Sequence, residues 1–122
     1  LPYLDAVIKE TLRLYPVAWL FSRQPVEPVS IGGRAFPIGT RVMISPWVMH
    51  RDPRWFDDPE AFRPERWLDG LEKRLPKFAY IPFGGGPRIC IGQHFALLEA
   101  TLVLAELAQH GPAISVQHLS AL

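Results

Sequence analysis

The stretch FGGGPRICIG, from Phe83 to Gly92, contains the only cysteine of the 122-residue chain. Its three consecutive glycines permit positive φ angles at which backbone amides face inward, and Pro87 fixes the turn before Arg88. The helical pattern that follows begins near Gly92, so Cys90 is expected at the positive end of a helix dipole, which favours the thiolate over the thiol. The stretch therefore predicts a thiolate able to ligate a soft or borderline metal.

The residues around Cys90 also indicate the shape and charge of a ligand. Gly92 allows the following helix to approach a flat, bulky group closely. Arg88, two residues before the sulfur, is placed to meet an anionic group on the same ligand. The pattern favours a thiolate-ligated cofactor that carries carboxylates.

Three other interpretations apply to a lone cysteine. It can be a small buried hydrophobe, which is the common environment of a free cysteine. A phosphate cradle is disfavoured because neither G-x-G-x-x-G nor a terminal Gly-Lys-Ser/Thr is present and Pro87 removes an amide. A zinc half-site at Cys90 and His94 lacks a second ligand pair, since His110 and His118 lie in the last stretch without further cysteines.

Helical periodicity is confined to the two ends of the chain. Apolar residues recur at helical spacing over residues 1–15, and Pro16 ends the pattern. A second helix is predicted over about residues 92–110, ended by Gly111 and Pro112. The apolar stripe of this second helix, from Phe95 to Ala105, is interpreted as core packing without a functional role.

The middle of the chain is rich in proline, with 13 in the whole sequence, about twice the typical share of about 5%. VSIGGRAFPIG, residues 29–39, carries a Gly-Gly hairpin signal, and RVMISPW, residues 41–47, alternates like a short strand. From His50 to Phe83, proline and aspartate are too frequent for either regular period. The predicted fold is mainly α, with a small antiparallel β-sheet and a long irregular loop.

The bulk composition fits part of a globular protein. Hydrophobic residues make up 48% and charged residues 20%, and a net charge of +1 favours neither nucleic acid nor an anionic membrane as a partner. Two helices and a hairpin offer too little apolar surface to offset the ordering of so long a loop, so we expect a piece of a larger domain. Without a leader or an apolar run of spanning length, no membrane segment is expected in this chain. A cytoplasmic location is the expectation, with a membrane anchor in a preceding part of the larger protein as the alternative.

The cysteine loop resembles the haem-binding signature of the cytochrome P450 family. That signature, Phe-x-x-Gly-x-Arg-x-Cys-x-Gly, matches at Phe83, Gly86, Arg88, Cys90 and Gly92. All its defined positions agree, which makes the loop a specific signal.

Two further motifs occur in the order that the family shows. Glu10 and Arg13 match its Glu-x-x-Arg pattern, and residues 64–67, Pro-Glu-Arg-Trp, resemble its Pro-Glu-Arg-aromatic element. Alone, Glu10 and Arg13 are equally well explained as a surface pair on a helix. The resemblance implies instead that Glu10, Arg13 and Arg66 form a buried ion-paired triad that fastens the long loop to the first helix.

The resemblance implies haem b as the cofactor and assigns roles around it. Cys90 is the axial thiolate ligand of the haem iron, and Phe83 packs against the proximal side of the haem. Arg88 pairs with one propionate, and Arg23 looks like the second propionate-binding residue. Amides of the glycine loop donate to the sulfur.

The segment after the first helix, residues 17–21, is expected from the same resemblance to border the distal pocket. Trp19 and Phe21 are the side chains expected to touch substrate.

The implied activity is that of a haem-thiolate monooxygenase. Such an enzyme inserts one oxygen atom from O2 into an apolar small molecule, with electrons from a ferredoxin or a flavoprotein reductase. A peroxide-using hydroxylase or an oxygen-independent isomerase of the same superfamily has the same thiolate, and the sequence does not separate them, nor does it name the substrate.

We expect residues 1–122 to be the later part of a P450 catalytic domain. The oxygen-activating helix and the N-terminal part are missing, and the residues after about Gln109 depart from the family's final β-region. An inert fragment without activity or haem binding is therefore the alternative for the chain by itself.

Overall fold

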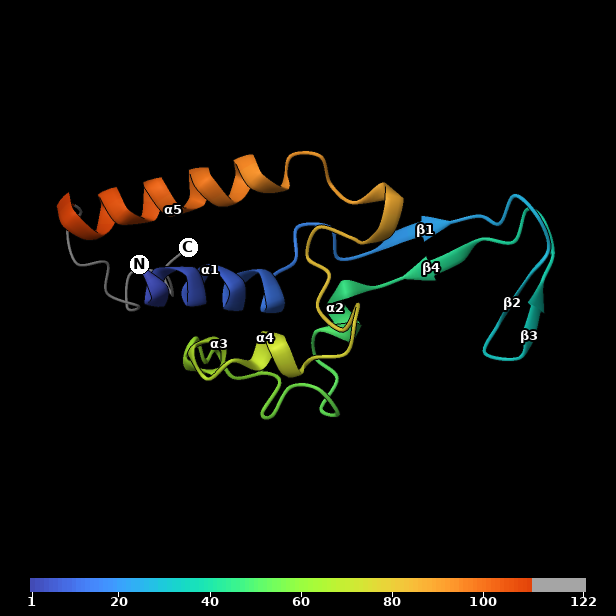
Figure 1. Ribbon diagram of the computed structural model, residues 1–122, viewed down its shortest axis with the longest axis horizontal. Helices are drawn as coiled ribbons and strands as arrows, with labels where there is room; N and C mark the ends of the chain where they lie inside the picture. Colours follow the sequence, from blue (N-terminus) through green and yellow to red (C-terminus); the bar gives the residue numbers. More distant parts are fainter. Residues whose placement is uncertain (111–122) are drawn as a thin grey trace, which may run out of the picture.

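Residues 1–110 are described by the computed structural model, in which α1 lies between α5 on one side and α3 and α4 on the other (Figure 1). A two-stranded ribbon extends from this helical part to a terminal hairpin. The predictions for Gly111, Pro112 and the segment after them lie outside the described residues. The elements are α1 (Pro2–Leu14), β1 (Phe21–Arg23), β2 (Val29–Ile31), β3 (Arg34–Phe36), β4 (Val42–Ile44), α2 (Pro46–Met49), α3 (Glu65–Leu68), α4 (Leu71–Arg74), the 3-10 turn η1 (Gly86–Arg88) and α5 (Gln93–His110).

The limits of α1 agree with the sequence pattern. Pro2 occupies the first turn, where its missing N–H has no intrahelical partner to lose. The helix ends at Leu14, and the Tyr15 amide donates a last hydrogen bond of 2.7 Å to the Thr11 carbonyl before Pro16 prevents continuation.

The strands form two small sheets where the sequence predicted one. β1 pairs with β4, with Phe21 opposite Ile44 and Arg23 opposite Val42. β1 was not predicted, because a three-residue strand is too short for a visible alternation. The strand predicted in residues 41–47 therefore pairs with β1, and the β2–β3 hairpin lies between the two strands in the sequence.

The Gly-Gly signal does produce the predicted hairpin. β2 and β3 are antiparallel, with Val29 opposite Phe36. Gly32 and Gly33 both have positive φ, 57° and 78°, which the tight two-residue connection requires. This hairpin lies at the far end of the molecule from α1 (Figure 1).

The segment from residue 50 to residue 83 is less irregular than predicted, because it contains the single-turn helices α3 and α4. Gly70 separates them in the left-handed conformation, with φ of 73°. One turn is too short to show helical periodicity in a sequence, so neither was predicted. The predicted class, mainly α with little antiparallel sheet and a long connecting segment, is confirmed.

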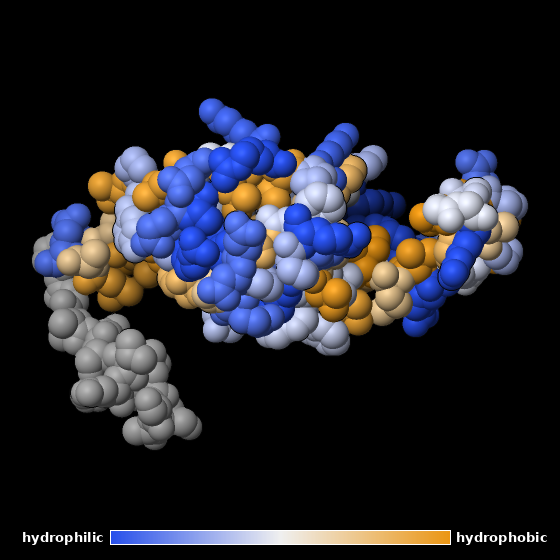
Figure 2. Space-filling model, turned by 90° about the horizontal axis from the view of Figure 1, so that it is seen from below, coloured by the Kyte–Doolittle hydropathy of each residue, from blue (hydrophilic) through white to orange (hydrophobic). Residues whose placement is uncertain are grey.

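The apolar core is small and lies beneath α1. The buried members of its main cluster come from α1, the long segment and α3, and three half-buried residues pack against them. The residues of this cluster are Ala6, Phe56 and Trp67, with Leu71, Leu75 and Tyr80 around them, and further buried apolar residues are Ile8, Leu14, Ala79 and Ile81. Hydrophilic and apolar residues both reach the face shown in Figure 2.

The interpretation of the α5 stripe as core packing was wrong for the described chain. Phe95, Leu98 and Leu102 are exposed, although α5 contacts α1. Because α5 is apolar on most of its circumference, it can contact α1 with residues other than the stripe. The stripe therefore has no covering element among residues 1–110. Within those residues, no helix is long and apolar enough to cross a membrane.

Candidate functional site

The Glu10 carboxylate is fully buried on α1 and is the centre of a charged cluster. Arg13 donates to both of its oxygens, from Nε to Oε2 at 2.9 Å and from Nη2 to Oε1 at 2.9 Å. Arg66 of α3 donates from Nε to Oε1 at 3.1 Å. The Trp67 indole donates to Oε2 at 2.9 Å, and the Arg63 amide donates to Oε1 at 2.8 Å. We call Glu10, Arg13, Arg66 and Trp67 the ion cluster.

The two arginines use their remaining donors on backbone carbonyls of the long segment. Arg13 donates to the carbonyls of His50 at 2.9 Å, Pro59 at 2.7 Å and Ala61 at 3.0 Å. Arg66 also donates to the carbonyl of Asp57, at 2.8 Å. The irregular part of the long segment is thus held against α1 by charge-assisted hydrogen bonds.

Hydrogen bonding outweighs burial in setting the charge of the cluster. Burial alone raises the pKa of Glu10, but the bonds from Arg13, the Arg63 amide and Trp67 lower this pKa below its ordinary value. Burial also lowers the pKa of Arg66, and the Glu10 charge opposes that change. Glu10 is therefore ionised between two cations.

Trp67 and His50 are parts of this arrangement that sequence reasoning missed. Trp67 belongs to the predicted Pro-Glu-Arg-Trp element, but no role was predicted for its indole N–H, which is one of the donors to Glu10. His50 is fully buried, and its Nδ1 lies 3.3 Å from the Arg13 carbonyl while its Nε2 accepts from the Ile81 amide at 2.9 Å. An amide can only donate, so Nε2 is unprotonated and Nδ1 carries the proton. No local pattern around a histidine signals partners this distant.

The cysteine loop has the positive φ angles that its glycines allow, at two of three positions. Gly84 and Gly86 have φ of 77° and 72°. Gly85 is extended and is required for another reason, because a Cβ there would lie 2.9 Å from ring atoms of Phe78. Pro87 lies inside the 3-10 turn η1.

Backbone hydrogen bonds hold Cys90 on both sides. Its amide donates to the Phe83 carbonyl at 2.9 Å, and its carbonyl accepts from the Gln93 amide at 3.3 Å, where α5 begins. The thiol itself is free and exposed. A Cβ on Gly92 would lie 3.8 Å from the sulfur, so this glycine leaves space beside the thiol.

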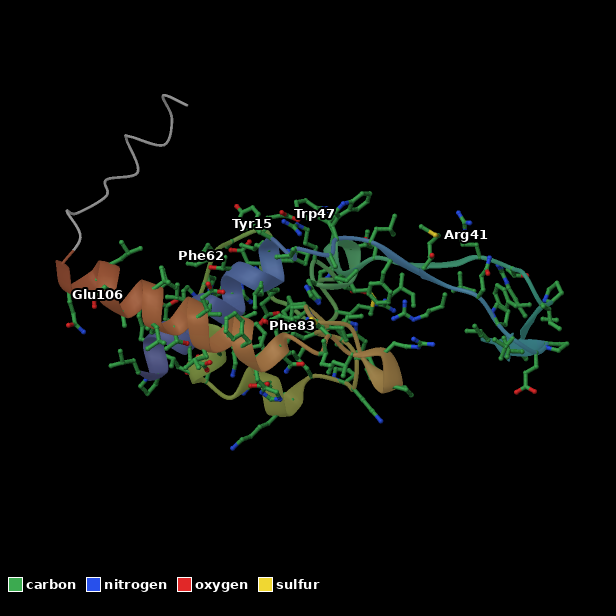
Figure 3. All side chains as sticks on the ribbon, turned by 90° about the horizontal axis from the view of Figure 1, so that it is seen from above. Tyr15, Arg41, Trp47, Phe62, Phe83 and Glu106 are labelled. Atoms are coloured by element: carbon green, nitrogen blue, oxygen red, sulfur yellow. The ribbon has the colours of Figure 1, made fainter. Side chains whose placement is uncertain are left out.

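One cavity of about 370 Å³ collects four of the candidate residues, Cys90, Arg88, Phe83 and Arg23. They come from the loop and from β1, which lie far apart in the sequence. Phe83 lies near the start of α5 (Figure 3). The other lining residues are apolar or glycine: Leu12, Val17, Ala18, Phe21, Pro82, Gly84 and Ala96.

The remaining candidates lie beside this cavity. Gly86 lines a neighbouring cavity of about 360 Å³, to which Phe21 and Arg23 also contribute. Gly92 is adjacent to the sulfur of Cys90.

Trp19 does not line this cavity, although Phe21 does, and the predicted contact of Trp19 with substrate stays a prediction. It lines a separate hollow with Tyr15, Pro16 and Trp47, and Figure 3 shows Tyr15 and Trp47 side by side at the edge of the molecule. The Ser45 hydroxyl donates to the Trp19 carbonyl at 2.9 Å and fixes the backbone there. Ala18 and Trp19 thus point to opposite sides of the segment between α1 and β1.

The donor set of the cavity fits haem. A thiol is available to iron, two guanidinium groups are available to two carboxylates, and the walls between them are apolar. Within residues 1–110, no group of three or more His, Cys, Asp and Glu side chains is placed to hold a metal ion.

Comparison with known proteins defines the class. A family model described as Cytochrome P450 matches residues 1–110. The chain therefore belongs to the cytochrome P450 family, a family of haem-containing monooxygenases.

Particular relatives come from bacteria and animals. The chain is 49% identical over 108 residues to cyclooctatin synthase of Streptomyces melanosporofaciens, covering 88% of this chain and 24% of that protein. It is 50% identical over 105 residues to cytochrome P450 4V2 of Mus musculus, covering 86% and 20%. It is 44% identical over 108 residues to cytochrome P450 3A15 of Cavia porcellus, covering 88% and 22%. The chain spans about a fifth to a quarter of the length of these curated relatives.

Glu10→Gln is expected to lower the free energy of unfolding by about 3 kcal/mol or more, because Arg13 and Arg66 then lose their buried counter-charge. Glu72→Gln is the matched control, since Glu72 pairs with Lys9 at 2.7 Å on the surface, and its loss is expected to cost less than about 1 kcal/mol. Urea denaturation measures both. Equal effects of the two substitutions would contradict the central place of Glu10.

His50 is expected to make stability depend on pH. Burial lowers its pKa from 6.5 to about 4. Because the folded pKa is the lower one, the contribution of neutral His50 is complete above pH 6.5 and is lost as the pH falls toward about 4. The free energy of unfolding is expected to drop by about 3 kcal/mol across this window from His50 alone. The same measurement on His50→Gln should give a flatter profile, and an unchanged profile would contradict the assignment.

Proposed function

We propose that this chain supplies the thiolate-bearing part of a haem monooxygenase, with Cys90 as the axial ligand of the haem iron. One observation supports this above all, namely that Cys90, Arg88 and Arg23 line one cavity with apolar walls. A thiol, two cations and an apolar surface are what haem b needs from a protein, for its iron, its propionates and its ring.

The loop supplies a ligand that is fixed in place before any group binds. The Cys90 amide is held by the Phe83 carbonyl, and the next turn is closed by the bond from the Ile89 amide to the Gly86 carbonyl at 3.1 Å. The sulfur is exposed, while two backbone hydrogen bonds hold the residue that carries it. When bound through such a thiolate, haem supplies oxygen-activating chemistry, since thiolate ligation favours O–O cleavage.

The two arginines orient the cofactor by its carboxylates. The Arg23 guanidinium is held over the Phe21 ring at 4.8 Å and donates to the Ser22 carbonyl at 2.9 Å, so it is already positioned on β1. Arg88 lies at the end of η1 and lines the same cavity. Two cations on separate elements would each pair with one carboxylate of the cofactor and would so select its orientation in the cavity.

The apolar side chains that line the cavity from the segment after α1, among them Val17 and Ala18, favour an apolar small-molecule substrate. A ferredoxin or a flavoprotein reductase is the proposed electron donor. O2 is the proposed oxidant, and the whole activity belongs to a protein of the length of the relatives. The chain by itself is proposed to be inactive, because it spans about a fifth to a quarter of that length and leaves the α5 stripe exposed.

Cys90→Ser is expected to abolish the long-wavelength Soret band of the reduced, CO-bound protein, because an alcohol oxygen does not replace a thiolate on iron. The measurement is a difference spectrum of the haem-loaded, full-length protein that contains this chain. Persistence of the band in the serine variant would exclude Cys90 as the ligand.

Arg88→Gln is expected to weaken haem affinity by about tenfold, the loss of one charge-assisted pair with a carboxylate. Arg41→Gln is the matched control, since Arg41 lies on the ribbon far from Phe83 and the loop (Figure 3). Haem transfer to apomyoglobin measures both variants. Equal affinities would refute the propionate role of Arg88.

Haem titration of the 122-residue chain alone separates the proposal of an inactive but haem-competent piece from an inert fragment. Stoichiometric uptake with the thiolate spectrum is expected if the loop and β1 suffice to seat the ring. Absence of uptake by the chain, with normal uptake by the full-length protein, would assign the missing affinity to residues outside this chain.

A further inference from the structure

We propose that His50 is a positioning residue for Cys90, coupling the ion cluster to the cysteine loop through its imidazole ring. This inference rests on the proposed function of Cys90 as haem ligand. It adds a residue that lies outside the cavity and outside the three sequence motifs.

On one side, His50 and Arg13 hold each other reciprocally. The Arg13 guanidinium donates to the His50 carbonyl at 2.9 Å, and the His50 Nδ1–H faces the Arg13 carbonyl at 3.3 Å. The ring is thereby fixed to the end of α1 at Arg13, the residue that also pairs with Glu10.

On the other side, three hydrogen bonds joined by short pieces of backbone lead from the ring to the cysteine. Nε2 of His50 accepts from the Ile81 amide at 2.9 Å. The Ile81 carbonyl accepts from the Gly84 amide at 3.0 Å, which closes the turn that contains Phe83. The Phe83 carbonyl then accepts from the Cys90 amide at 2.9 Å. The His50 side chain therefore connects the backbone of the cysteine loop to α1.

The surroundings of His50 prevent the ring from turning. None of its surface is exposed, and it packs against the Tyr80 ring with centroids 5.1 Å apart. Tyr80 is itself fixed, since its hydroxyl donates to the Lys9 carbonyl at 3.0 Å. Only a ring with a donor on one edge and an acceptor on the other satisfies both the Arg13 carbonyl and the Ile81 amide.

Two amide substitutions separate the two edges of the ring. His50→Asn keeps a donor near the Nδ1 position for the Arg13 carbonyl and removes the acceptor from the Ile81 amide. His50→Gln extends further and keeps an acceptor near the Nε2 position. Tyr80→Phe is the control, because it removes the bond to Lys9 and leaves the three hydrogen bonds between His50 and Cys90 intact.

The experiment compares CO-bound spectra of the haem-loaded, full-length protein for the wild type and the three variants. A positioning role predicts that His50→Asn shifts the ratio of thiolate-ligated to unligated haem by about fivefold, the effect of one lost buried hydrogen bond. His50→Gln and Tyr80→Phe are expected to retain the wild-type ratio, even where they lower the urea midpoint.

Each outcome bears on the proposal. A wild-type ratio in folded His50→Asn overturns it, and so does an equal loss of ligation in all three variants, which indicates a general loss of packing. If His50→Asn does not fold, the ratio in His50→Gln decides, since loss of ligation there contradicts the role given to Nε2. Absence of the thiolate band from the wild type overturns the proposed function itself, an outcome distinct from a normal band that no His50 variant changes.

Discussion

Glu10 brings a negative charge to the buried face of α1, with none of its surface exposed, and five hydrogen bonds compensate for the lost solvation. The donors belong to Arg13 on the same helix and to residues 63, 66 and 67, more than fifty positions later in the chain. A buried carboxylate missing its partners costs several kcal/mol. The path of the long segment is therefore fixed by the need to satisfy one charge.

The position of the cysteine loop depends on the same buried charge, through hydrogen bonds and the backbone. The apolar cluster under α1 is small, with Ala6, Phe56 and Trp67 as its buried members. Hydrogen bonds here hold segments together that a larger apolar core holds in other domains, and they specify position more tightly than apolar contacts. Hydrogen bonds through Arg13, His50 and Ile81 connect the ion cluster at Glu10 to the loop at Cys90.

The sequence predicted the parts whose signals are local. The ends of α1, the Gly-Gly hairpin and the cysteine loop all follow from neighbouring residues. The structure also brings Arg23 into one cavity with Cys90, although residues 23 and 90 are far apart in the chain. The family pattern was needed to single out Arg23, because a lone arginine near a short strand carries no signal by itself.

What sequence reasoning missed depends on contacts between distant residues. The partners of His50 are 37 and 31 positions away, and the indole of Trp67 meets a carboxylate 57 positions earlier. The bends between α1 and β1 place Trp19 in a different hollow from Phe21, and the α5 stripe finds no cover among residues 1–110.

The most direct test of the account is X-ray absorption at the iron edge of the haem-loaded, full-length protein. The account predicts one sulfur scatterer in the first coordination shell of the iron, present in the wild type and replaced by a light atom in Cys90→Ser. A first shell of nitrogen and oxygen alone in the wild type would contradict it.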